Sequence, residues 1–173
     1  EQILSLGAKP VFVEDEAGDA ETAGGYAREM SDAYREKQAA LVSETIARQD
    51  IVITTALIPG RSAPRLVSAA QVATMKAGSV IVDLAVEHGG NVEGVRPGEV
   101  AVSANGVRIV GHTNYASRMA TDASALFARN LLNFITVFWD REAATLRLPD
   151  EDEIVQAIRV TRGGAIVHPA LAA

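Results

Sequence analysis

The fold is decided by residues 50–60, which read Asp50-Ile51-Val52-Ile53-Thr54-Thr55-Ala56-Leu57-Ile58-Pro59-Gly60. The β-branched run at its start is too short for a helix and too uniformly apolar for a strand with one solvated face, so it predicts a buried parallel strand. Ligands bind at the carboxyl ends of such strands in open α/β sheets. Thr54 and Thr55 would place hydroxyl groups there, and Ala56 and Leu57 would offer main-chain groups and a small apolar surface that suits a flat ring. The alternative is a core strand followed by an ordinary turn.

The composition sets broad limits on function. The chain has 173 residues, 48% of them hydrophobic, which is enough to bury a core, and one large domain is the default expectation. The net charge is -6 and the basic residues are scattered, which argues against nucleic acid and against an anionic membrane surface. There is no cysteine, and no apolar run approaches the roughly 18 residues of a membrane helix.

The first 30 residues predict little regular structure. Residues 1–7 resemble the last turns of a helix that ends at Gly7, so we expect the chain to start inside a longer fold. Residues 10–13 predict a short strand. The acidic and glycine-rich segment that follows predicts a long loop, in which Gly25 and Tyr26 would give a hinge and a ring suited to closing over a ligand. A plain loop tip is the alternative.

The middle of the chain predicts a βαβ unit and a hairpin. Ser31 would cap a helix that runs to about Ala47, and Ser68 opens a capping box for a short helix that we expect to end at Gly78. Residues 79–85 then predict a second buried strand, parallel to the first and next to it. Asn105-Gly106 predicts a hairpin turn between strands at residues 100–102 and 107–110.

Polar residues follow two more strand ends. Asp83 lies near the end of the second strand, and Glu87, His88 and Asn91 come soon after it and could supply polar contacts. Gly111-His112-Thr113-Asn114 follows the strand at residues 107–110. His88 taken alone is more often a solvated loop histidine than a catalytic one.

The C-terminal third differs in kind. Residues 117–140 predict one long helix whose apolar stripe suggests packing on two partners, such as an absent domain or a subunit. Residues 145–148, 154–160 and 165–167 predict short strands, with a possible hairpin about Gly163-Gly164. The chain has no G-x-G-x-x-G turn, no Ser-His-Asp order, no G-x-x-x-x-G-K phosphate loop and no histidine metal pair. Its polar strand ends therefore suit positioning a cofactor better than attacking a substrate.

Several segments together resemble a known family. They are Ala20-Glu21-Thr22-Ala23-Gly24-Gly25-Tyr26-Ala27, the stretch from Thr54 to Gly60, Asp83-Leu84-Ala85-Val86-Glu87 with Gly89-Gly90-Asn91, Gly111-His112-Thr113-Asn114, and Asn130-Leu131-Leu132-Asn133-Phe134. In order and spacing they resemble the NAD(H)-binding alpha subunit of proton-translocating NAD(P) transhydrogenase, over effectively the whole chain. Alanine dehydrogenase, a relative, shares the strand ends but is less similar at the Gly-Gly-Tyr loop and at residues 111–114. Tyr115-Ala116 and His88 depart from the family pattern.

The resemblance implies a Rossmann-like α/β fold that binds NAD(H), with a parallel sheet truncated at its N-terminus. Residues 1–116 would form an incomplete NAD-binding domain, and the long helix and small strand segment of residues 117–173 would pack on an N-terminal domain. The family's first strand, glycine-rich turn and ribose-binding acid do not occur in this chain. No catalytic residue and no metal ligand is implied, and the residues that would contact NAD(H) are Gly25, Tyr26, Thr55, Ala56, Leu57, Asp83, Leu84, Ala85, Glu87 and Asn114.

The activity that the resemblance implies is hydride transfer between NAD(H) here and NADP(H) on a partner subunit, coupled to proton translocation. The implied partners are NADP(H)-binding and membrane-spanning subunits and a second copy of the chain, in a cytoplasmic complex peripheral to the inner membrane. We expect the chain to be inactive alone. One alternative is an alanine dehydrogenase, in which Glu87 would stand near the substrate. Another is a noncatalytic nucleotide-binding or interaction module.

Overall fold

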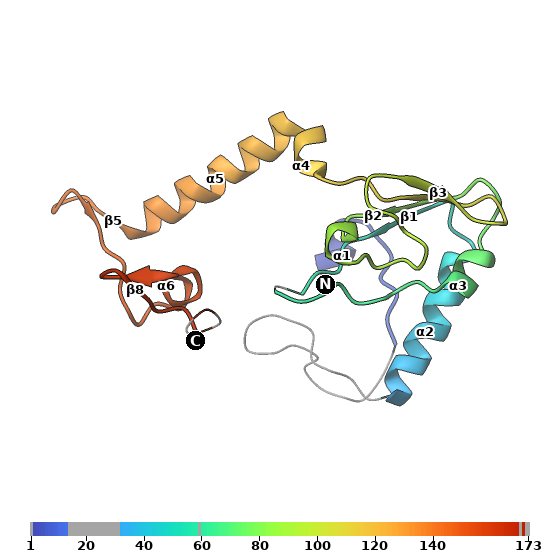
Figure 1. Cartoon of the computed structure of the whole chain (residues 1–173). Helices are drawn as coiled ribbons and strands as arrows, with labels where there is room; N and C mark the ends of the chain where they lie inside the picture. The colour runs from blue at the N-terminus through green and yellow to red at the C-terminus, as the bar shows by residue number, and fades with distance from the viewer. Residues whose placement is uncertain (1, 14–31, 59, 170, 172–173) are drawn as a thin grey trace. The chain divides into compact units, whose positions relative to one another are not determined.

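The computed structural model describes residues 2–13, 32–58, 60–169 and 171 of the chain (Figure 1). The chain divides into two compact units, Glu1–Tyr115 and Ala116–Ala173. Each is described by itself below. The expected Ser31 cap and the Gly25-Tyr26 loop lie outside the described residues.

The first unit is built on a four-stranded sheet. Its strands are β1 (Ile51–Thr54), β2 (Val80–Asp83), β3 (Val100–Val102) and β4 (Arg108–Val110), in the order β1-β2-β4-β3. β1, β2 and β4 are parallel, with Ile51 opposite Val80 and Thr54 opposite Asp83, whereas β3 runs antiparallel to β4. The predicted α/β class, the parallel β1–β2 pair and the Asn105-Gly106 hairpin are confirmed.

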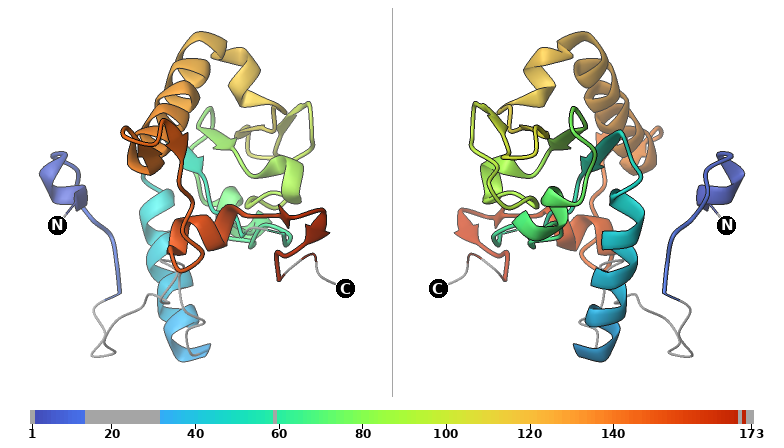
Figure 2. Two further views of the ribbon diagram at one scale, coloured as in Figure 1. Left: turned by 90° about the vertical axis from the view of Figure 1, so that its left-hand side faces the viewer. Right: turned by 90° about the vertical axis from the view of Figure 1, so that its right-hand side faces the viewer.

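Two helices and the sheet enclose one apolar core. Helices α2 (Asp32–Ile46) and α3 (Ala69–Ala73) lie side by side (Figures 1 and 2), and the Gln71 side-chain amide of α3 donates to Ser43 Oγ of α2 at 2.7 Å. Apolar burial of this kind supplies most of the stability of a small domain. The buried members of the core are Ile46, Val67, Val72, Met75, Ile81, Val92, Val107 and Ile109.

The first strand differs from its prediction. β1 is an edge strand of the described sheet, and Ile51 and Ile53 on its outer face are 67% and 61% exposed. Within the described residues no element covers that face. The prediction of a strand buried on both faces is therefore wrong for this part of the chain, although Thr54 on the other face is buried.

The short elements are governed by their caps. The capping box between Ser68 and Gln71 is confirmed, but α3 ends at Ala73 with Thr74 as its C-cap rather than at Gly78. Helix α1 (Gln2–Ser5) ends as predicted, with Gly7 in the left-handed region and its N–H donating to Leu4 O. Residues 10–13 form no strand, since no described segment pairs with them. A single 3-10 turn, η1 (Val86–His88), follows β2.

The second unit has a long helix and two small hairpins. The predicted single helix is divided at Met119 into α4 (Tyr115–Arg118), which starts at the unit boundary, and α5 (Ala120–Phe138). β5 (Trp139–Asp140) pairs with β6 (Thr145–Leu146), and β7 (Thr161–Arg162) pairs with β8 (Ala165–Ile166) across Gly163-Gly164, which confirms the second hairpin. The predicted strand at residues 154–160 is wrong. It is mostly helix α6 (Glu153–Ile158), because the Asp152 side chain accepts from the Ile154 and Val155 amides and caps it.

Candidate functional site

Three loops leave the sheet at the same edge. β1, β2 and β4 are parallel and in register, so their carboxyl ends at Thr54, Asp83 and Val110 lie side by side. The Leu84 N–H donates to Thr54 O at 2.9 Å and continues this pairing by one residue. The structure therefore brings together the predicted residues that follow the strands: Thr55, Ala56, Leu57, Leu84, Ala85, Glu87 and Asn114.

Asp83 is fully buried at the centre of this edge. Its Oδ1 accepts from the Ala85 N–H at 2.9 Å, and its Oδ2 accepts from the N–H groups of Asn91 at 2.7 Å and Val92 at 3.0 Å. A buried carboxylate needs such partners, because an unpaired charge in the interior is strongly unfavourable. The carboxylate thus binds the main chain of the loop that follows its own strand.

Asn91 links that loop to the loop after β1. The residue is fully buried, and its Oδ1 accepts from the Ala56 N–H at 3.0 Å. Its Nδ2 donates to Ala56 O at 2.9 Å and to Pro64 O at 2.8 Å. The sequence suggested Asn91 only as one of several polar groups, and its partners lie 35 and 27 residues away along the chain.

The residues on either side of these bonds are open at the surface. Thr55 is exposed, Leu57 is 47% exposed and Leu84 is 39% exposed, whereas Ala85 is fully buried. Glu87 is also exposed, and its Oε2 accepts from the Asn114 N–H at 3.0 Å, which joins the loops after β2 and β4. The edge thus presents apolar and hydroxyl side chains at the surface, while the buried side chains of Asp83 and Asn91 hold the main chain of these loops.

Glycines allow these loops to pack closely. Gly90 has φ +76°, and a Cβ there would overlap Val95 Cγ1 and lie 2.8 Å from Asp83 Oδ2. A Cβ at Gly111 would overlap Arg96 O. Both positions therefore need glycine for its small size, and Gly90 also needs its backbone freedom.

Two buried polar atoms at this edge have no hydrogen-bond partner among the described residues. They are Thr54 Oγ1 and His112 Nδ1. The His112 ring lies against the Tyr115 ring, with centroids 6.2 Å apart and planes tilted by 58°. His88 is exposed on η1, as a solvated loop histidine would be.

Other features of the described chain do not mark a second site of this kind. A hollow of about 410 Å³ lies against α3 and the β3–β4 hairpin, but none of the predicted cofactor residues lines it. Residues 2–13, 32–58 and 60–169 contain no group of three or more His, Asp or Glu side chains that could hold a metal ion. Over the same ranges, every helix is too short or too polar to cross a membrane.

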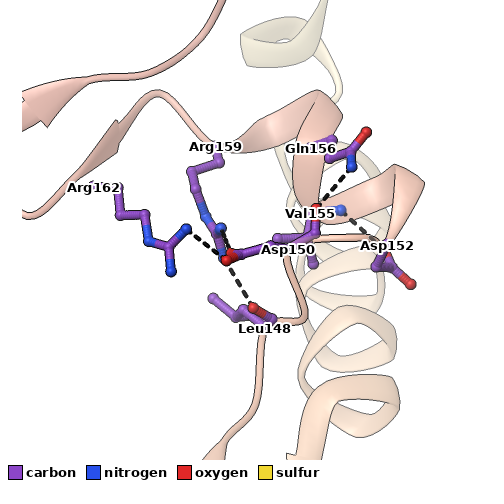
Figure 3. A network of polar contacts seen from close by, with 7 residues as sticks. All are labelled: Leu148, Asp150, Asp152, Val155, Gln156, Arg159 and Arg162. Carbon is purple, nitrogen blue, oxygen red and sulfur yellow. Dashed lines mark hydrogen bonds and ion pairs between the residues drawn. The ribbon is translucent and has the colours of Figure 1, made fainter.

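The second unit carries an ionic cluster around Asp150 (Figure 3), in which the Asp150 and Arg162 side chains are exposed and the Arg159 side chain is half-buried. The Asp150 carboxylate pairs with the guanidinium groups of Arg159 and Arg162, the latter at 2.6 Å. Arg159 Nη2 also donates to Leu148 O at 3.0 Å, and Gln156 Nε2 donates to Asp150 O at 2.7 Å. Hydrogen bonds from Arg159 and then Arg162 hold the pKa of Asp150 below its usual value of 3.8.

Comparison with known proteins agrees with this fold. The chain is 56% identical over 172 residues to an NAD(P) transhydrogenase alpha subunit of Rhodospirillum rubrum, a match that covers 99% of this chain and 44% of that protein. The crystal structure of transhydrogenase from Sinorhizobium meliloti is 51% identical with a TM-score of 0.70, over 96% of this chain and 42% of that one. A solved L-alanine dehydrogenase is 28% identical with a TM-score of 0.53, over 76% and 37% of the two chains.

The chain thus spans less than half the length of these relatives. Residues 1–169 match the family described as alanine dehydrogenase/PNT, C-terminal domain, which includes almost the whole chain. Both the identity and the parallel sheet lead to the same conclusion: the chain belongs to the alanine dehydrogenase/PNT C-terminal domain family.

Proposed function

We propose that the chain is the NAD(H)-binding part of a transhydrogenase that passes hydride between NAD(H) and an NADP(H) held by a partner subunit, coupled to proton translocation. The observation that carries this proposal is the common edge of β1, β2 and β4, where three linked loops expose small and apolar groups. Dinucleotides bind at this edge of open α/β sheets. The 56% identity to a transhydrogenase alpha subunit favours this reaction over others.

The residues present fit a dinucleotide. Leu57 and Leu84 offer exposed apolar surface for a ring, Thr55 offers a hydroxyl, and Ala56 lies between two exposed residues. NAD(H) supplies the hydride chemistry when bound, and the chain's residues bind and orient the rings and exclude water. In this proposal Asp83 and Ala85 shape the site from below, Glu87 and Asn114 close its side, and Gly25 and Tyr26 fold over the nucleotide.

The proposal extends to partners. The NADP(H)-binding and membrane-spanning subunits, and a second copy of this chain, would form a complex on the cytoplasmic side of the inner membrane. The apolar side chains of α5 suit packing against another domain of the relatives' longer chain. Phe127 is 65% exposed, Leu126 is 63% exposed and Leu132 is 62% exposed in the unit as described.

An alanine dehydrogenase is the second candidate, because Glu87 is exposed at the same edge beside Asn114 and the fold is shared with a solved L-alanine dehydrogenase. A noncatalytic nucleotide-binding or interaction module is the third. A pure interaction module would show no preference for NADH over NADPH in a binding test, and a module that binds the nucleotide without reacting would show no hydride transfer to either acceptor.

The decisive experiment uses the full-length protein with its NADP(H)-binding partner subunit. Hydride transfer from NADH to an NADP⁺ analogue is measured beside turnover with pyruvate and ammonium. Transfer only to the analogue supports the proposal, and turnover only with pyruvate and ammonium would replace it with the dehydrogenase. Leu57→Ala is expected to weaken NADH binding. Val102→Ala is the matched control, because Val102 is an exposed apolar residue at the opposite end of the sheet.

A further inference from the structure

We propose that Asn91 is a positioning residue for the dinucleotide site. Its buried side-chain amide fixes the main chain at Ala56 before any ligand binds, and Asp83 holds Asn91 in place. The inference rests on the proposed function, because it concerns the same edge of the sheet. It gives Asn91 no contact with the ligand.

The Asn91 amide acts on Ala56 as a second peptide group would. Its oxygen accepts from the Ala56 N–H at 3.0 Å and its nitrogen donates to Ala56 O at 2.9 Å, so both main-chain groups of Ala56 are satisfied by one side chain. The third bond, to Pro64 O at 2.8 Å, holds the other end of the same loop. One side chain therefore ties both ends of the loop after β1.

The position of Asn91 is itself set by the sheet. Asp83 ends β2 opposite Thr54 of β1, and its Oδ2 accepts from the Asn91 N–H at 2.7 Å. Asn91 O in turn accepts from the N–H groups of Leu66 at 2.8 Å and Val67 at 3.0 Å. A continuous series of bonds thus runs from the strand through Asp83 and Asn91 to Ala56.

This series of hydrogen bonds ends at Ala56, next to the exposed residues of the proposed ligand site. Asp83 and Asn91 are fully buried and Ala56 is half-buried, whereas its neighbours Thr55 and Leu57 are exposed. Ala56 lies beyond the end of β1, so the strand pairing no longer fixes it. Without the amide, this loop would have to be ordered when the cofactor binds, and that ordering would reduce affinity.

Asn105 provides a matched control. It lies in the β3–β4 turn, and its Nδ2 also donates only to main-chain carbonyls, those of Val72 at 3.1 Å, Ala73 at 3.3 Å and Met75 at 3.0 Å. These bonds hold the end of α3 and involve no residue of the loop after β1. Asn105→Ala thus removes these three bonds and the one that Asn105 Oδ1 accepts from Ser103 Oγ at 2.6 Å, all outside the loop after β1.

The test uses the full-length protein and compares wild type, Asn91→Ala and Asn105→Ala. Three quantities are measured: the Kd for NADH, the unfolding midpoint, and amide hydrogen exchange over residues 54–66. For Asn91→Ala we expect a Kd raised on the order of tenfold and faster exchange at residues 54–66. For Asn105→Ala we expect a lower unfolding midpoint with an unchanged Kd. If Asn91→Ala does not fold, Asn91→Ser keeps a small neutral polar side chain that is too short to bridge Ala56 and Pro64, and it should shift the Kd in the same direction.

The outcomes separate this inference from the proposed function. A wild-type protein that does not bind NADH would overturn the proposed function. Wild-type binding with an unchanged Kd in Asn91→Ala would overturn only the inference. An equal rise in Kd for Asn91→Ala and Asn105→Ala would also overturn it, because the cause would then be general destabilisation.

Discussion

Two aspartates show how differently the two units use a carboxylate. Asp83 is fully buried and accepts three main-chain N–H groups, whereas the Asp150 side chain is 52% exposed and pairs with two arginines. Judged by charge alone, Asp150 with its two arginines would form the stronger interaction of the two carboxylates. Exposed ion pairs contribute little, however, because water competes with them and long side chains must be ordered, while a buried group that loses its partner cannot turn to water. Burial, more than formal charge, therefore decides how much each carboxylate contributes to stability.

The largest effect is expected for Asp83→Asn. The amide would turn an N–H₂ group toward main-chain donors and leave at least one buried N–H without an acceptor. We expect the free energy of unfolding to fall by about 3 kcal/mol, because bonds to charged acceptors are the stronger kind. Urea unfolding measures this loss. If Asp83→Asn lowers the free energy of unfolding no more than Asp150→Asn does at neutral pH, the buried carboxylate does not contribute more than the exposed one.

Gly90 and Gly89 test the packing around Asp83. Both have positive φ, +76° and +96°, but only at Gly90 would a Cβ meet Asp83 and Val95; at Gly89 nothing lies within 4 Å. Gly89→Ala is expected to cost about 1 kcal/mol for the left-handed backbone alone, and Gly90→Ala about 2 kcal/mol, because its Cβ must also displace Val95 and Asp83. Denaturant unfolding of both variants measures the difference, and equal losses would show that the loop can move away from Asp83.

The sequence predicted the local parts of this fold better than the distant ones. The Ser68–Gln71 capping box and the Asn105-Gly106 turn depend on residues a few positions apart, and both are confirmed. The apolar run at residues 10–13 predicts a strand, but a strand requires a partner that local sequence does not reveal. Residues 154–160 are rich in β-branched residues, yet the Asp152 cap starts a helix there. The apolar side chains of Ile51 and Ile53 predict burial, but they are exposed because no element of the described chain packs on that face of β1.

The candidate site follows the same rule. The βαβ pattern predicts the parallel pairing of β1 with β2, and this pairing is enough to bring the loops after these two strands together. The parallel pairing of β4 with β2, which adds the third loop, is a long-range contact that local sequence does not predict. That Asn91 would bind Ala56, 35 residues earlier, depends on tertiary structure and could not be deduced from spacing. The burial of the Asp83 carboxylate is likewise a property of the folded loop.

Thr54→Val removes a buried polar atom, Thr54 Oγ1, which, unlike the Asp83 carboxylate, has no hydrogen-bond partner among the described residues. Thr54 Oγ1 is buried without a hydrogen bond among the described residues, so its removal forfeits nothing that the described structure shows. We expect the free energy of unfolding to stay the same or to rise by up to about 1 kcal/mol. Thermal or urea unfolding would detect the change. A clear fall in the free energy of unfolding would mean that the hydroxyl has a hydrogen-bond partner in the protein and contributes to stability.

The smallest effect at neutral pH is expected for Asp150→Asn, and here the dependence on pH is the informative quantity. Arg159 and Arg162 lower the pKa of Asp150 in the folded protein below 3.8, so the unfolded chain binds its proton at a higher pH than the native one does. The stabilisation is therefore fully present above about pH 4 and is lost as the pH falls through the native pKa. Unfolding midpoints of wild type and Asp150→Asn should differ slightly at neutral pH and converge in acid. Asp140, whose pKa is lowered first by the Ala143 N–H and also by Arg147, titrates alike in both proteins and cancels in the comparison. A gap that stays constant into acid would show that the carboxylate of Asp150 does not stabilise the second unit through its charge.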